Sequence, residues 1–68
     1  MVVIIEQEAL EENYFEVIRR YNDLGWGLIY TRCIMNHYVL LKLSWLSDLP
    51  PEFPDLSDLD LPSPVFLK

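Results

Sequence analysis

The sequence predicts an α+β fold in which one helix packs on a three-stranded antiparallel sheet. Three patterns predict it: a β-branched run at residues 2–5, a helical apolar stripe between residues 8 and 24, and a hairpin pattern over residues 26–45. All five prolines then fall within residues 50–64. Because proline disrupts helices and central strands, we divide the chain into a β-α-β-β body at residues 1–45 and an extended, acidic, proline-rich docking tail at residues 46–68.

The first strand is predicted over Val2–Ile5, since β-branched residues are enriched in buried strands. The helix is predicted from about Glu8 to Leu24. One stripe at helical spacing supports it: Leu10, Tyr14, Val17, Ile18, Tyr21 and Leu24. The acidic residues of its first turns and the basic residues near its end suit the helix dipole. Gly25 is well suited to a left-handed cap that ends the helix.

A hairpin is predicted from two strands, residues 26–34 and 38–45, with Asn36 as the best turn residue. The sequence does not determine the pairing register of these two strands. An even-length loop puts these residues on one face: Trp26, Leu28, Tyr30, Arg32, Val39, Leu41, Leu43 and Trp45. An odd-length loop exchanges half of that set, and in neither case is one face cleanly polar.

The order strand, helix, strand, strand favours an antiparallel sheet with the third strand between the first two, which leaves both outer strands as edges. One helix covers only one face of such a sheet. Tyrosine, leucine and isoleucine side chains on the second face then need a cover. A second copy of the chain or the C-terminal tail can supply it, and we expect a homo-oligomer.

Composition narrows the function classes. Eleven acidic and five basic residues give a net charge of −6, which disfavours direct binding to nucleic acid or to anionic membranes. Cys33 is the only cysteine, so no disulfide forms within the chain. The start Met-Val-Val-Ile-Ile-Glu has no basic region, and no apolar stretch approaches the eighteen or so residues of a membrane span. We therefore expect a cytoplasmic protein.

Candidate reactive groups have simpler structural explanations. Cys33 and His37 lie on opposite sides of a predicted turn, without an oxyanion-hole motif, so Cys33 is interpreted as a small apolar filler. The carboxylates of the predicted helix are interpreted as its solvated face: Glu8, Glu11, Glu12 and Glu16. The tail aspartates lack the glycine and glutamate of a calcium loop. We expect a non-enzymatic protein with no catalytic, cofactor or metal site.

The tail carries the functional prediction, because acidic and apolar residues alternate along it as in segments that bind partners. We expect it to dock on a protein partner with a basic or apolar groove, as an adaptor, regulatory subunit or assembly factor. The aspartates would steer the encounter and the apolar side chains would anchor it: Trp45, Phe53, Leu56, Leu59, Leu61, Val65 and Phe66. The competing structural interpretation is that the tail wraps its own body.

An alternative function follows from the acidic character. Some phage-encoded inhibitors imitate nucleic acid and occupy a nucleic-acid-binding surface on their target. The small size and the acidic residues of this chain fit such an inhibitor, although five basic residues moderate its charge. Salt separates the alternatives, because affinity that depends on charge falls with ionic strength whereas apolar docking changes little.

The segment Tyr21-Asn-Asp-Leu-Gly-Trp-Gly-Leu-Ile29 and the hairpin end Val39-Leu-Leu-Lys42 resemble a family of small bacterial proteins of unknown function. In that family a helix ends in an Asn-x-x-Gly-Trp-x-Leu pattern that leads into a β-hairpin of a strand-helix-strand-strand body. The resemblance covers roughly residues 2–43 and excludes the tail. It implies the fold only, and the chain departs from the family pattern at Gly27, where an acidic residue is usual.

Overall fold

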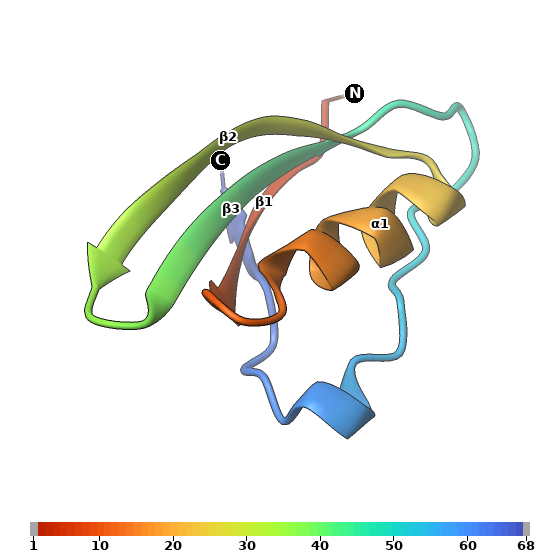
Figure 1. Cartoon of the computed structure of the whole chain (residues 1–68). Coiled ribbons are helices and arrows are strands. Elements are labelled where there is room, and N and C mark those ends of the chain that lie inside the picture. Colours follow the sequence, from red (N-terminus) through yellow and green to blue (C-terminus); the bar gives the residue numbers. More distant parts are fainter. Residues whose placement is uncertain (1, 68) are drawn as a thin grey trace.

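The computed structural model describes residues 2–67. Its strands are β1 (Ile4–Leu10), β2 (Trp26–Met35), β3 (Tyr38–Trp45) and β4 (Val65–Leu67), and its helices are α1 (Tyr14–Leu24) and the short 3-10 helix η1 (Ser57–Leu59). The strands form one antiparallel sheet in the order β2-β3-β1-β4, and α1 packs on one face of it (Figure 1). The α+β class is confirmed, but the sheet has four strands where the sequence predicts three.

The additional strand comes from the tail. β3 lies between β1 and β2 as predicted, but β4 pairs with β1 over Ile4–Glu6. β1 is therefore an inner strand at that end, and the outer strands of the sheet are β2 and β4. The prolines did not exclude a strand here because β4 contains none and lies at the edge of the sheet.

The predicted boundary between the first strand and the helix is wrong. Residues Glu8–Leu10 belong to β1, where they pair with Tyr38–Leu40 of β3. Ile5, Gln7 and Ala9 of β1 are buried in alternation with half-buried residues, which is the strand period. The helix begins only at Tyr14, after a turn in which the Leu10 N–H donates to the Asn13 side chain at 3.0 Å. Pairing along the whole of β3 outweighs the helical spacing of Leu10.

The hairpin has a two-residue loop, Asn36–His37, in which His37 has a φ of 70°. The register shifts between Leu28 and Tyr30 and again between Cys33 and Met35. Each shift inserts one residue into β2 and moves the following side chains to the other face. The even-length loop is correct, yet Tyr30 and Arg32 lie opposite the face predicted for them.

The core lies between the sheet and α1. Its fully buried members come from β1, α1, β2 and β3: Ile5, Ala9, Val17, Tyr21, Trp26, Val39, Leu41 and Leu43. The tail lies on the same side of the sheet as α1, so Leu56, Leu59 and Leu61 pack against this core. Figure 1 shows the tail running from β3 past the end of α1 to η1 and back to the sheet as β4.

Gly25 ends α1 as predicted. Its φ of 122° is disfavoured for residues with a Cβ atom, and its N–H donates to the Asn22 carbonyl at 3.2 Å. A Cβ atom at this position would lie 3.3 Å from the Trp45 ring. The helix can therefore turn directly into β2 only because this residue is glycine.

Candidate functional site

Tail residues 46–67 are fastened to the body by backbone carbonyls that accept hydrogen bonds from core side chains. The Trp26 indole N–H donates to the Glu52 carbonyl at 2.7 Å, and the Gln7 amide donates to the Pro62 carbonyl at 2.9 Å. Nearer the sheet, the Trp45 indole N–H donates to the Leu49 carbonyl at 2.6 Å. Proline-rich backbone has few donors of its own, so its carbonyls are the groups by which the body can hold it.

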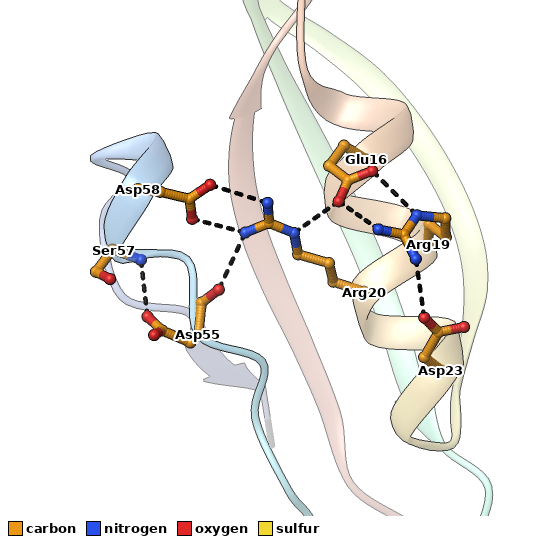
Figure 2. A network of polar contacts seen from close by, with 7 residues as sticks. All are labelled: Glu16, Arg19, Arg20, Asp23, Asp55, Ser57 and Asp58. Atoms are coloured by element: carbon orange, nitrogen blue, oxygen red, sulfur yellow. Dashed lines mark hydrogen bonds and ion pairs between the residues drawn. The ribbon is translucent and has the colours of Figure 1, made fainter.

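Arg20 of α1 supplies the charged contact to the tail (Figure 2). Its guanidinium donates to both carboxylate oxygens of Asp58 at 2.7 and 2.9 Å and to the Asp55 carbonyl at 3.1 Å. Its Nε donates to Glu16 at 2.8 Å, and Glu16 also accepts from Arg19. The paired arrangement of Arg20 and Asp58 fixes the direction of η1 relative to α1.

These hydrogen bonds stabilise the charged forms. Hydrogen bonds from Arg19 and Arg20 lower the pKa of the Glu16 carboxyl to about 2. The hydrogen bond from Arg20 lowers the pKa of Asp58, and the Ser57 backbone N–H lowers the pKa of Asp55. Three acidic groups around η1 and α1 are thus held ionised by specific donors.

A buried polar pair lies beneath the tail. Gln7 has no exposed surface, and the Tyr21 hydroxyl, which is 1% exposed, donates to its Oε1 at 2.7 Å. The Gln7 amide donates to the Glu8 and Pro62 carbonyls, so no buried side-chain polar atom in the described part of the chain is left unpaired. Burial raises the pKa of the Tyr21 hydroxyl to about 12.

Aromatic rings connect the end of the sheet to the tail surface. Trp26 contacts Tyr21, Trp45 and Phe53, with ring centroids 5.8, 5.2 and 5.4 Å apart. Phe53 in turn contacts Phe66 edge-on at 5.7 Å. The series runs from a fully buried tryptophan to a phenylalanine that is 59% exposed.

The structure separates the predicted anchor residues into two groups. Leu56, Leu59 and Leu61 face the core and are half-buried. The others keep more of their surface at the exterior, with Phe53, Val65 and Phe66 exposed by 42, 61 and 59% and Trp45 half-buried. Phe53 and Phe66 form one apolar patch on the helix side, whereas Val65 points to the opposite face of the sheet, because it pairs with Glu6 while Phe66 pairs with Ile5.

The second face of the sheet, called the outer face below, carries no described element (Figure 1). The strand register places four rows of side chains on it: Ile4 with Ser44 and Leu67; Glu6 with Lys42, Tyr30 and Val65; Glu8 with Leu40 and Arg32; and Leu10 with Tyr38 and Met35. The Tyr30 hydroxyl lies 3.4 Å from Glu6, and the Lys42 ammonium lies 5.4 Å from the Tyr30 ring centroid.

The residues weighed for catalysis are not brought together. Cys33 is exposed on β2, and His37 is exposed in the hairpin turn. Glu8 lies on the outer face, Glu11 and Glu12 lie in the turn before α1, and Glu16 is engaged by arginines. Within residues 2–67, no group of three histidine, cysteine or acidic side chains could hold a metal ion.

Sequence reasoning missed Arg20 and Gln7 as the residues that hold the tail. Their partners lie 35–55 positions away in the chain, so no spacing pattern connects them. The available signal was that Gln7 occupies the same alternate positions of the strand as the apolar Ile5 and Ala9, between two glutamates.

Comparisons with family models, curated proteins and solved structures found no match to this chain. The resemblance noted in the sequence therefore rests on its residues alone. Among the described helices, none has the length and apolar character needed to cross a membrane.

Proposed function

We propose that the chain is a non-enzymatic protein–protein interaction module, an adaptor, regulatory subunit or assembly factor that docks through its tail and self-associates through its sheet. The apolar patch of Phe53 and Phe66 carries the proposal. Both rings remain more than 40% exposed although a packed aromatic core lies directly beneath them. Exposed aromatic side chains on a fixed support are typical of binding hot spots.

In this proposal the tail binds as a folded surface. Leu56, Leu59 and Leu61 hold the tail on the body, so Phe53 and Phe66 are presented in a fixed arrangement and little ordering entropy opposes binding. Trp45 lies at the far end of the aromatic series, and Val65 lies on the other side of β4. Trp45 extends the contact area on the helix side, whereas Val65 belongs to the face of the sheet that we propose for self-association.

The charges of the tail indicate which kind of surface a partner would present. Five acidic residues of the tail are exposed: Asp48, Glu52, Asp55, Asp58 and Asp60. Asp58 already pairs with Arg20, so it contributes little to attraction over distance. A partner with an apolar groove and a basic rim fits this surface. We place the module in the cytoplasm, where the exposed Cys33 thiol would stay reduced.

The test compares two exposed phenylalanines. Phe66→Ser removes the proposed anchor, and Phe15→Ser removes a ring that is 73% exposed at the start of α1. Partners cross-linked to the full chain in its own cells are identified by mass spectrometry, and their affinity for each purified variant is then measured by calorimetry. We expect Phe66→Ser to weaken binding about 30-fold, the effect of losing a hot-spot residue, and Phe15→Ser to leave it unchanged.

Equal affinity for the parent chain and the Phe66→Ser variant would contradict docking through the tail. The same calorimetry at low and high salt separates the proposal from the alternative of an inhibitor on a nucleic-acid-binding surface. Apolar docking keeps its affinity as salt rises, whereas a charge-based imitation of nucleic acid loses most of it.

A further inference from the structure

The outer face is the face of the sheet that no described helix or loop covers (Figure 1). The sequence allows two covers for it, the tail or a second copy. The tail packs on the other side, with α1, and contributes to the outer face only Val65 and Leu67 at the β4 rim. The inference below rests on the self-association part of the proposed function and specifies its geometry.

The charges of this face are segregated by strand. β1 presents Glu6 and Glu8, whereas β3 presents Lys42 and β2 presents Arg32. Glu6 and Lys42 are directly opposite one another in the β1–β3 register. One half of the face is thus acidic and the other half basic, so the face is complementary to itself under a suitable rotation.

Only one two-fold axis makes use of this pattern. An axis parallel to the strands places β1 of one copy over β3 of the other, so acidic and basic columns meet. An axis across the strands would instead place β1 over β1 and bring four carboxylates together, which is repulsive. Either axis keeps the strands of the two sheets aligned, as in face-to-face sheet packing, so the charges decide between the two axes.

We propose that two copies of the chain associate through their outer faces about an axis parallel to the strands, with Glu6 of each copy opposite Lys42 of the other. The same superposition brings apolar residues into contact on both sides of the ion pairs. Leu10 meets Tyr38 of the second copy, and Val65 meets Tyr30 of the second copy. Glu8 comes beside Arg32 of the second copy.

An interface of ordinary size would use a modest part of the surface of this chain. A stable protein interface covers about 800 Å² on each partner, which is about one sixth of the 4725 Å² that this chain exposes. Each copy also carries a net charge of −6, and the two copies repel one another at long range. Association is therefore best measured at about 0.15 M salt, where charges more than about 8 Å apart are largely screened.

The test uses charge reversal on the full chain in analytical ultracentrifugation. Glu6→Lys and Lys42→Glu each place like charges across the proposed interface, and we expect each variant to dimerise at least about tenfold more weakly than the parent chain. An equimolar mixture of the two variants restores both ion pairs and should form a heterodimer. The double variant Glu6→Lys with Lys42→Glu should dimerise again by itself.

Glu12→Lys is the matched control, because it makes the same charge change at an exposed position outside this face. It should leave dimerisation unchanged. Circular dichroism establishes that each variant is folded. If single reversals do not weaken the dimer, or if the mixture stays monomeric, the proposed interface is refuted. A parent chain that is monomeric at about 1 mM refutes self-association itself and leaves docking through Phe66 to be judged by its own experiment.

A cross-link provides a test that does not depend on reversed charges. In a Cys33→Ser background, Tyr30→Cys and Val65→Cys place thiols three strand spacings apart within one copy, about 14 Å, which a cross-linker shorter than that distance cannot span. Across the proposed interface the two positions face one another with their backbones about 10 Å apart, so a short bifunctional thiol reagent should give a covalent dimer. Variants with only one of the two cysteines should not form the covalent dimer efficiently. If the variant with both cysteines stays monomeric, the proposed geometry is wrong.

Discussion

At the scale of single residues, Gln7 and Tyr21 form a buried polar pair beneath the tail. Both are fully enclosed, and each hydrogen bond of this pair satisfies a polar atom that water cannot reach. The body and the tail share the pair, because the Gln7 amide continues to the Pro62 carbonyl. Its contribution to stability can therefore be measured by removing one hydroxyl.

Tyr21→Phe should lower the free energy of unfolding by about 1–3 kcal/mol, because the buried Gln7 Oε1 loses its donor. A denaturant titration monitored by circular dichroism measures this free energy of unfolding. Tyr14→Phe is the matched control, since Tyr14 is only half-buried and its hydroxyl makes no hydrogen bond within residues 2–67. Equal stability of Tyr21→Phe and the parent chain would show that the buried hydroxyl is dispensable.

Glu16 gives a prediction for acid pH. Its pKa is lowered from 4.5 to about 2, so the unfolded chain binds more protons at this group in that interval. The stabilisation is present above pH 4.5 and is lost as the pH falls towards 2. Glu16→Gln should flatten this part of the curve of unfolding free energy against pH. Glu12→Gln removes the same charge at an exposed turn position and is the control for the loss of charge itself. A curve for Glu16→Gln that keeps the full slope would contradict the assignment.

At the scale of elements, the contact between α1 and η1 decides how firmly the tail is held. Arg20 and Asp58 form a paired contact, but Asp58 is 61% exposed, so solvent screening keeps its contribution to global stability small. The contact lies between two elements that are otherwise connected through the leucines of the tail. Its loss should therefore be visible as local opening before it is visible as unfolding.

Arg20→Gln should increase hydrogen exchange of the β4 backbone amides by up to about fivefold, with little change in β3. Arg19→Gln is the control, because the ion pairs of Arg19 stay within α1. Exchange is measured by mass spectrometry on the full chain. Equal protection of β4 in the two variants would mean that the leucines hold the tail without help from Arg20.

At the scale of the whole molecule, the tail completes the core. The body alone would expose the Trp26 ring, the Gln7 amide and the edge of β1, all of which the tail covers. A body of about 45 residues is also close to the size below which domains need outside help. The division at residue 46 thus marks a change in amino-acid composition. In the folded chain, the body and the tail share one core.

A chain that stops at Trp45 should lose cooperative unfolding or aggregate, because it leaves apolar core surface and an unpaired strand exposed. Light scattering coupled to size exclusion, with near-ultraviolet circular dichroism, compares it with the full chain. Addition of a peptide of residues 46–68 should restore the tryptophan signal. A truncated chain that is monodisperse and fully folded would show that the tail is not part of the fold.

The sequence determined the elements whose signals are local. The β-branched and aromatic strands, the glycine after the helix and the central position of β3 follow from composition, turn chemistry and chain connectivity, and all three agree with the structure. The helix start was predicted wrongly because Glu8 and Leu10 satisfy both the strand and the helix periods. Pairing with β3, a contact about 30 positions away, decided in favour of the strand.

Only the tertiary structure decided the role of the tail and of the outer face. The apolar side chains of the tail predicted that it docks on a surface. Their spacing does not show whether that surface is the core of the same chain or a groove of a partner. The partners that hold them, Gln7, Arg20 and Trp26, become neighbours only when the chain folds. The first bulge of β2, between Leu28 and Tyr30, likewise decided that Tyr30 and Arg32 join Glu6 and Lys42 on one face, because an inserted residue reverses the alternation of the residues that follow.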